Sequence, residues 1–246
     1  MNELTVSIVM PVLNEAAIIE AALSRLRTDF PDCELLVIDG GRTDDTIARA
    51  GLHARVIQSA RGRARQMNTG SALTDGAVLW FVHADTVVQA GALPQIRDVL
   101  RDSGTVGGGL TLRFDASSAG LRYLAWTSNL RARRLHWIFG DQAMFVRREA
   151  FESVGGFPEL PLMEDLELSR RLAAVGQLAV VPATSTASAR LFNEHGTWPM
   201  VAFMQWLKVL YFAGVDPAEI ARRYARGPRL LARRAVAEEP ARVVSS

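Results

Sequence analysis

The stretch Ala77-Val78-Leu79-Trp80-Phe81-Val82-His83-Ala84-Asp85-Thr86 decides the fold class of this chain. An apolar run with β-branched and aromatic side chains ends abruptly in a histidine, a small residue and a carboxylate. Such a run is typical of a buried parallel strand, which delivers polar groups to the carboxyl edge of its sheet. Ligands bind at that edge in open α/β sheets. An aspartate there could instead cap the next helix, so this stretch alone leaves both interpretations open.

Strand segments alternate with helical patterns before this stretch. We expect strands over 5–11, 34–38 and 55–58, with helical patterns that follow Asn14, Thr46 and Asn68. Pro11 is expected to end the first strand, and Asn14 to cap the first helix. The residues 59–68 are expected to form a loop. This alternation predicts βαβ units, and therefore an α/β fold with a mostly parallel central sheet flanked by helices.

The second half of the chain continues the pattern less regularly. The alternation after three glycines at 107–109 predicts an antiparallel or edge strand over 106–114. A helix is expected over 121–135, with Arg122, Arg131, Arg133 and Arg134 on a solvated face. A loop at 140–146 feeds a short strand, a helix begins near Glu164, and a last strand covers 178–182.

The segment 198–213 is apolar nearly all round and predicts a C-terminal hydrophobic helix. Because it is apolar nearly all round, its surface must be covered, and the run is too short to span a membrane. Burial against its own domain, a homodimer contact and a membrane-surface contact are the alternatives. The arginine-rich tail after Glu219 is expected to be a solvated helix, or to bind an anionic lipid surface. We therefore expect a main domain over 1–190, with halves 1–100 and 101–190, and a helical extension over 191–246.

Composition narrows the class of protein. The chain has 246 residues, 49% of them hydrophobic and 22% charged, so it can bury a full core. One cysteine, Cys33, excludes an internal disulfide. Lys208 is the only lysine, so nearly all the basic residues are arginine. This excess of arginine suits an anionic substrate, and a biased genome composition explains it equally well.

Several classes of function are disfavoured. The chain has no Gly-x-Gly-x-x-Gly after the first strand and no P-loop motif, which argues against a dinucleotide dehydrogenase and a P-loop enzyme. Its basic residues lack interleaved aromatic residues, so no nucleic acid is expected as a partner. The first residues lack the pattern of a signal peptide, which predicts a cytoplasmic protein, with a peripheral position at the inner membrane face as an alternative.

Four motifs in order carry a resemblance to a known family. They are Pro11-Val12-Leu13-Asn14-Glu15, Asp39-Gly40-Gly41-Arg42-Thr43-Asp44, His83-Ala84-Asp85 and Glu164-Asp165. Over residues 5–190 the chain resembles the family 2 glycosyltransferases. The sequence of residues 83–86 and of the segment after Gly176 is most similar to a short soluble branch of that family, the arsenosugar-biosynthesis type. The resemblance implies a GT-A fold, a nucleotide-diphosphate sugar as donor, a divalent cation, and inversion at the anomeric carbon. A UDP- or GDP-sugar is the favoured donor, and the hydroxyl acceptor is not identified.

The resemblance also implies a donor site. Asp39 would accept hydrogen bonds from the base or ribose, and Arg65 or Arg61 would balance the charge of the diphosphate. The remaining candidates for contact with the nucleotide sugar are Pro11, Val12, Asn14, Glu15, Gly40, Gly41, Asn68, His83 and Ala84.

Asp85 is the predicted metal ligand. Mg²⁺ takes one or two protein carboxylates together with phosphate oxygens, so a single aspartate is sufficient. A metal there would stabilise the negative charge that develops on a diphosphate leaving group. His83 stands where the family commonly has an aspartate. Its imidazole suits Mn²⁺ better than Mg²⁺, or it bonds the ribose or a phosphate, and the second role is the one we favour.

An inverting displacement also needs a carboxylate to accept the proton of the attacking hydroxyl. Asp165 is the predicted base, Glu164 would orient it or the acceptor, and Asp141 is a second candidate. Gly140, Gln142 and Arg190 are the predicted acceptor residues. A sugar nucleotidyltransferase is the alternative enzyme, but it needs a glycine-rich basic loop after the first strand. A non-catalytic nucleotide-sugar-binding or scaffold protein is the alternative outside enzymes.

Overall fold

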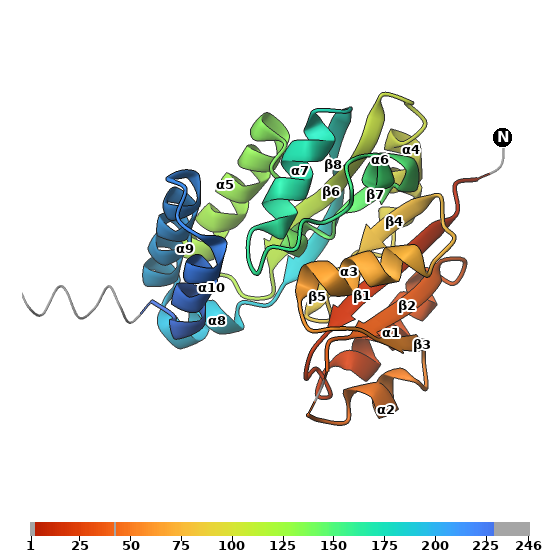
Figure 1. Ribbon diagram of the computed structural model, residues 1–246, viewed down its shortest axis with the longest axis horizontal. Helices are drawn as coiled ribbons and strands as arrows, with labels where there is room; N and C mark the ends of the chain where they lie inside the picture. Colours follow the sequence, from red (N-terminus) through yellow and green to blue (C-terminus); the bar gives the residue numbers. More distant parts are fainter. Residues whose placement is uncertain (1–2, 42, 229–246) are drawn as a thin grey trace, which may run out of the picture. The chain divides into compact units, whose positions relative to one another are not determined.

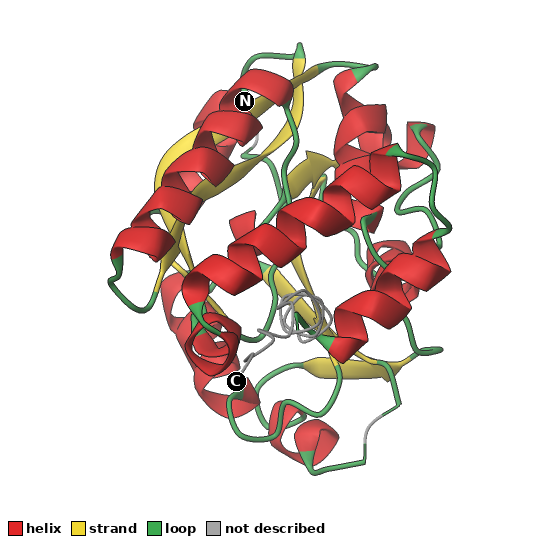
Figure 2. Cartoon of the chain, turned by 90° about the vertical axis from the view of Figure 1, so that its left-hand side faces the viewer, coloured by secondary structure: helices red, strands yellow, loops and turns green. Residues whose placement is uncertain are grey.

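The computed structural model describes residues 3–41 and 43–228, and the chain divides into two compact units, Met1–Ser188 and Ala189–Ser246. The first unit contains an eight-stranded sheet with helices packed on its faces (Figures 1 and 2). The strands are β1 (Val6–Val12), β2 (Glu34–Asp39), β3 (Arg55–Gln58), β4 (Val78–Phe81), β5 (Thr86–Val88), β6 (Thr105–Phe114), β7 (Phe145–Arg147) and β8 (Gln177–Ala187). Their spatial order is β3-β2-β1-β4-β7-β6-β8-β5.

Most of these strands run in one direction. β1 to β4 pair in parallel, and β6 pairs in parallel with β8. β7 is antiparallel to both β4 and β6, and β5 is antiparallel to β8. The predicted α/β fold, with a mostly parallel sheet flanked by helices, is therefore confirmed.

The helices of the first unit cover both faces of the sheet. They are α1 (Ile19–Asp29), α2 (Thr46–Ala50), α3 (Arg63–Ala72), α4 (Ala92–Val99), α5 (Ala119–Leu135), α6 (Arg148–Ser153) and α7 (Glu164–Ala173), with a 3₁₀ turn η1 (Gly140–Gln142). Successive strand side chains enter opposite cores: Ile8 and Trp80 pack with α1 and α4, whereas Val9 and Phe81 pack with α3, α5, α6 and α7. Both cores are apolar because these strands are buried on both faces.

Three expectations about the first half are wrong. Pro11 does not end the first strand, since β1 runs to Val12; β4 pairs only as far as Val9, so the missing N–H of Pro11 removes no ladder hydrogen bond. Asn14 does not cap α1, which begins at Ile19, because its side chain binds a neighbouring loop. The expected loop over 59–68 is in part helix, since α3 begins at Arg63.

The strand expected over 106–114 is antiparallel to β7 but is not an edge strand, because β6 lies between β7 and β8. The glycines explain this position. A Cβ atom at Gly108 would lie 2.0 Å from the Ala179 carbonyl oxygen and 2.6 Å from the Phe145 ring. Glycine therefore allows the backbones and the ring to pack closely in the middle of the sheet.

A bulge in β8 and the short strand β5 were not expected. The β6–β8 register shifts from Leu110↔Val181 to Thr111↔Thr184, so β8 has extra residues at this point. Side chains bind the backbone there: Ala183 N–H donates to Gln95 Oε1 (2.8 Å), and Thr184 N–H donates to Gln89 Oε1 (3.0 Å). Beyond the bulge, β8 pairs with β5, which begins directly after Asp85.

The second unit contains α8 (Arg190–His195), α9 (Thr197–Phe212) and α10 (Pro217–Arg226). Helix α9 corresponds to the predicted hydrophobic helix, and its Trp198, Val209 and Phe212 side chains are exposed. Within the described part of the chain, none of the helices combines the length and the apolar character needed to cross a bilayer. In the arginine-rich tail, Arg222, Arg223 and Arg226 lie on α10, whereas Arg229, Arg233 and Arg234 lie outside the described residues.

Candidate functional site

The loops that follow β1 and β2 at the carboxyl edge are held together by side chains. Backbone N–H groups of these loops bind side chains across them: the Thr43 N–H donates to Asn14 Oδ1 (2.8 Å), the Ala16 N–H to Asp44 Oδ2 (3.1 Å), and the Glu15 N–H to Thr46 Oγ1 (2.8 Å). Asn14 adopts a positive φ of 57°, a conformation that asparagine tolerates better than most residues. The structure therefore brings the predicted Asn14–Glu15 and Asp39–Asp44 motifs side by side.

Asp39 ends β2 and is fully buried, and its Oδ2 accepts a hydrogen bond from the Gly41 N–H (3.1 Å). Gln66, which the sequence analysis missed, ties the two strand ends together. Its Nε2 donates to the Val12 and Ile38 carbonyl oxygens, both at 2.8 Å. A Cβ atom at Gly40 would lie 2.8 Å from Gln66 Oε1, so a larger residue here would push the Gln66 amide from its position. Val12 and Pro11 are buried in β1.

Two of the residues predicted to contact the nucleotide sugar have partners within the protein. Arg65 is exposed and forms an ion pair with Glu159 (2.8 Å). Asn68 donates to the Phe157 carbonyl oxygen (2.8 Å) and accepts from the Phe157 N–H (2.9 Å). Asn68 therefore fixes a loop residue, and its contact with a donor remains a prediction, as does that of Arg65.

Asp85 follows β4 at the carboxyl edge of the sheet. Its carboxylate is exposed and makes no hydrogen bond or ion pair with any described residue, whereas the preceding Ala84 is buried. No group of three or more His, Cys, Asp or Glu side chains gathers into a metal site within residues 3–41 and 43–228. A single accessible carboxylate still fits Mg²⁺ or Mn²⁺ when phosphate oxygens complete the coordination. Asp85 is thus suitable for a metal that arrives with a diphosphate.

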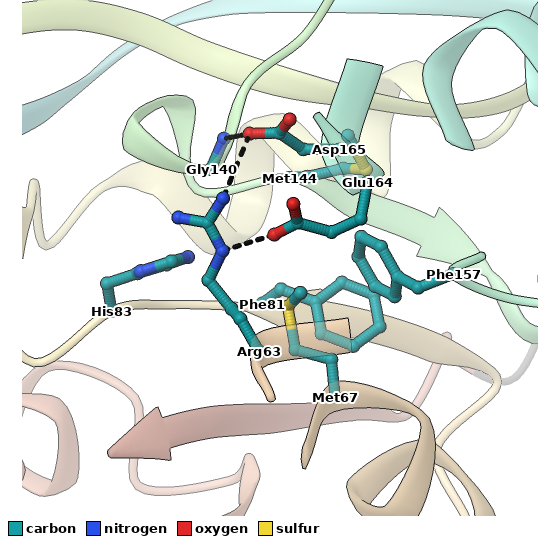
Figure 3. Close-up of a pocket in the computed structure, with 9 residues that line it drawn as sticks. All are labelled: Arg63, Met67, Phe81, His83, Gly140, Met144, Phe157, Glu164 and Asp165. Atoms are coloured by element: carbon teal, nitrogen blue, oxygen red, sulfur yellow. Dashed lines mark hydrogen bonds and ion pairs between the residues drawn. The ribbon is translucent and has the colours of Figure 1, made fainter. Parts of the chain in front are cut away.

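A second group of predicted residues lines a pocket (Figure 3). Its polar side chains are Arg63, His83, Glu164 and Asp165, and its other lining residues are Met67, Phe81, Gly140, Met144 and Phe157. Helix α3 supplies the arginine, the segment after β4 the histidine, and the first turn of α7 the two carboxylates. Mostly apolar walls therefore surround a small cluster of charges.

Arg63 lies between the two carboxylates in Figure 3. Its Nε donates to Glu164 Oε1, and its Nη2 lies 4.0 Å from Asp165 Oδ2. Asp165 also accepts hydrogen bonds from the backbone, through Oδ2 from the Gly140 N–H (2.9 Å) and through Oδ1 from the Leu166 N–H (2.8 Å). Glu164 is 1% exposed and Asp165 6% exposed, whereas the Arg63 side chain is 39% exposed.

The environment alters the proton affinity of Glu164. Burial raises the pKa of its carboxyl group above the usual 4.5, and the nearby negative charge of Asp165 acts in the same direction, whereas Arg63 opposes both. Glu164 Oε2 is buried and has no hydrogen-bond partner among the described residues. Since an apolar site disfavours the charged form, Arg63 is what favours an ionised Glu164 here.

His83 is neutral at pH 7. Burial lowers the pKa of its imidazole to about 3, and the positive charge of Arg63 adds to the effect. A Cβ atom at Gly140 would lie 2.8 Å from His83 Nε2, so the ring packs directly against this glycine. The structure therefore brings His83 and Gly140, predicted on the donor and acceptor sides, to the same pocket.

The other predicted acceptor residues differ in their placement. Asp141 is half-buried in η1, whereas Gln142 is fully buried and its Nε2 donates to the Leu110 carbonyl oxygen (3.2 Å). Arg190 begins α8 in the second unit. The acceptor roles of these three residues remain predictions.

The position expected for Arg131 is wrong. This residue does not lie on a solvated face with Arg122, Arg133 and Arg134, which are exposed. Its Nε donates to the Trp137 carbonyl oxygen (3.3 Å), and its guanidinium lies 4.2 Å from the centroid of the Phe139 ring. Burial lowers the pKa of Arg131, and the charges of Asp141 and Asp165 oppose that shift. Leu124, Ser128 and Ala132 recur at helical spacing and are buried, so their pattern could have indicated which face of α5 is turned inward near Arg131.

Comparison with solved structures agrees with this architecture. The mannosyltransferase PcManGT from Pyrobaculum calidifontis, in complex with GDP-Man and Mn²⁺, superposes with a TM-score of 0.66 at 19% identity, covering 91% of this chain and 70% of that chain. Glucosyl-3-phosphoglycerate synthase from Mycobacterium tuberculosis, in complex with Mn²⁺, UDP-glucose and phosphoglyceric acid, gives a TM-score of 0.61 at 21% identity, covering 86% and 80% of the two chains. The predicted GT-A fold is thereby confirmed.

Sequence comparison identifies the family. The chain is 31% identical over 166 residues to a PGL/p-HBAD biosynthesis glycosyltransferase of Mycobacterium bovis (strain BCG / Pasteur 1173P2). That match covers 61% of this chain and 62% of the relative, so the chain spans less than two thirds of the length of this relative. The model of the family described as glycosyl transferase family 2 matches residues 7–155, more than half of the chain. The chain therefore belongs to glycosyl transferase family 2.

Proposed function

We propose that this protein transfers one sugar from a nucleotide-diphosphate sugar to a hydroxyl acceptor, with a divalent cation and with inversion at the anomeric carbon. The observation that carries the proposal is the pocket in which Glu164 and Asp165 are buried beside Arg63, on a sheet that also presents Asp39 and Asp85 at its carboxyl edge. Family membership supports the same reaction type.

The donor is bound at the loops after β1, β2 and β4. Hydrogen bonds between the loops after β1 and β2 form a preorganised wall, and Asp39 lies behind it as an acceptor for the base or ribose. The complexes of the two structural neighbours with GDP-Man and UDP-glucose support a GDP- or UDP-sugar as the donor.

Asp85 would hold the divalent cation, which when bound supplies a Lewis acid for the charge that develops on the departing diphosphate. The exposure of its carboxylate supports this role, because an incoming ion and its phosphates need access. The neutral imidazole of His83 is able to accept a hydrogen bond from a donor hydroxyl.

Asp165 accepts the proton of the acceptor hydroxyl. Hydrogen bonds from the Gly140 and Leu166 N–H groups hold its carboxylate in one orientation, as a general base requires. Asp141, in the same 3₁₀ turn as Gly140, is the second candidate for this proton. The hydroxyl oxygen forms the new bond to the anomeric carbon while the old bond breaks, and the nucleotide diphosphate leaves with the electron pair.

Isothermal titration with UDP, GDP, CDP and TDP, each with and without Mn²⁺, tests the donor site. We expect Mn²⁺-dependent binding of one diphosphate, which Asp85→Ala loses and Asp165→Asn retains. Transfer or hydrolysis of the matching nucleotide sugar is then measured by release of that diphosphate. Absence of binding to all four diphosphates at millimolar concentration would overturn the proposal.

A further inference from the structure

The pocket holds two carboxylates that do not readily coexist in an apolar site. Glu164 and Asp165 are consecutive buried residues, and neighbouring carboxylates resist double ionisation unless a cation lies beside them. Arg63 supplies that cation from α3, with Nε bound to Glu164 Oε1 and Nη2 at 4.0 Å from Asp165 Oδ2. One guanidinium therefore balances charge for both acids.

The two acids depend on Arg63 to different degrees. Asp165 is held by two backbone N–H groups and approaches the guanidinium only at 4.0 Å. Glu164 binds the guanidinium directly, and its other oxygen has no hydrogen-bond partner in the described part of the chain. The hydrogen bond to Glu164 therefore holds the Arg63 guanidinium in its position beside Asp165.

We infer that Arg63 and Glu164 form a positioning pair for Asp165: Glu164 fixes the guanidinium beside Asp165, and the guanidinium favours the ionised carboxylate. The inference rests on the proposed function, in which Asp165 accepts the hydroxyl proton. Because the pair is neutral in sum, Asp165 carries the net negative charge of the three groups before the proton moves, and the three are neutral together afterwards.

Other charged or titratable groups face this cluster. His83 lies on the segment after β4 and lines the same pocket as a neutral ring. Arg131 of α5 and Asp141 of η1 interact electrostatically with each other, and Arg131 also interacts with Asp165. None of these groups is changed in the experiment below, so their contribution stays constant.

The test compares the pH dependence of kcat/KM in variants of the pair. Arg63→Gln leaves the Glu164 carboxyl beside Asp165 without the cation, so the acid limb of the profile should move to higher pH, by about one unit. Glu164→Gln leaves the cation uncompensated, so the acid limb should move to lower pH. The double variant should return towards the wild-type profile, and Arg63→Lys, which keeps the charge, should shift least.

A matched control lies on the same helix. Glu167 and Arg170 form an ion pair at 3.1 Å near the surface of α7, so Glu167→Gln should leave the acid limb in place. The inference is wrong if the Arg63 and Glu164 single variants lose activity without moving the acid limb of the pH profile. It is also wrong if both variants move that limb in the same direction. A single variant that does not fold is replaced by the double variant and by Arg63→Lys.

A second readout does not need turnover. The ¹³C-carboxyl resonance of Asp165, identified by its loss in Asp165→Asn, is titrated by NMR in the free protein and its variants. Opposite shifts of its midpoint in Arg63→Gln and Glu164→Gln support the pair, and equal midpoints overturn it. If the wild-type protein transfers no sugar from any nucleotide sugar, the proposed function fails, while this titration still decides the electrostatic coupling.

Discussion

Asp85 and Asp165 are both carboxylates of the candidate site, yet their surroundings are opposite. Asp85 is exposed and has no hydrogen-bond or ion-pair partner in the part of the chain that the structure describes, whereas Asp165 is buried and accepts two backbone hydrogen bonds. A residue that receives a metal and a diphosphate from solution gains from access. A residue that accepts a proton gains from a fixed orientation and from the exclusion of water. The difference supports the proposal that Asp85 acts in ligand binding and Asp165 in the chemical step.

The largest expected effect comes from Asp165→Asn. The amide keeps the shape of the side chain but cannot accept a proton, so turnover should fall by about 10²- to 10⁴-fold. Binding of the nucleotide diphosphate should be unchanged, because the proposed donor contacts come from Asp85 and the loops after β1 and β2 and not from Asp165. Steady-state release of diphosphate and isothermal titration measure the two quantities. A variant that loses binding and keeps turnover would reverse the comparison between the two carboxylates.

The next effect concerns stability. Removing one partner of a buried ion pair costs about 3–5 kcal/mol, but Arg63 is 39% exposed, so Arg63→Gln should lower the free energy of unfolding by about 2 kcal/mol. The double variant Arg63→Gln/Glu164→Gln should recover most of that loss, since the Glu164 carboxylate that bound the guanidinium directly is then also removed. Urea denaturation measures each value. Equal losses in the single and double variants would show that the buried charge is not the cause.

Asp85→Ala is expected to affect ligand binding alone. The Mn²⁺-dependent affinity for the nucleotide diphosphate should fall at least about tenfold, which corresponds to about 1.4 kcal/mol. The free energy of unfolding should change by no more than about 0.5 kcal/mol, because the exposed carboxylate has no described partner to lose. A large loss of stability in this variant would remove the contrast with the pocket.

The smallest effect is a pH dependence of stability. Because the pKa of Glu164 is raised above 4.5 in the folded protein, the folded state binds more protons than the unfolded state in this range. The stability that this group contributes is present below about pH 4.5 and decreases as the pH rises through its folded pKa. Wild-type protein should therefore lose stability relative to Glu164→Gln as the pH rises above about 4.5, as measured by urea denaturation. A difference that moves in favour of the wild type as the pH rises would contradict the shift.

The strand ends could be predicted from the sequence because the residue pattern that marks them is local. Apolar runs that stop at Asp39 and at His83-Ala84-Asp85 predict polar groups at one sheet edge, and the observed sheet places them there. Glu164 and Asp165 were likewise expected in the first turn of a helix, where they lie. The bulge and β5 were not predictable in this way, since they depend on pairing between segments that are far apart in the sequence, as in Leu110↔Val181 and Thr86↔Ala187.

The sequence did not single out Arg63 among the three arginines, for a physical reason. Arg61, Arg63 and Arg65 are equivalent in a loop, and only the helical phase of α3 directs Arg63 towards the pocket while Arg65 stays exposed. The partner of Arg63 lies 101 positions away, so no local pattern marks the pair. Gln66 was missed for the same reason, because its partners are carbonyl groups of β1 and β2.

The short connection from β4 to β5 has a mechanical consequence. Residues 82–85 join a strand in the middle of the sheet to one at its far edge, although β7, β6 and β8 lie between them in the spatial order. The chain is anchored on both sides of Asp85, by pairing of β4 with β1 and by pairing of Thr86 with Ala187. Any change in the twist of the sheet would therefore displace the Asp85 carboxylate, so the stiffness of the whole sheet limits how far this side chain can move.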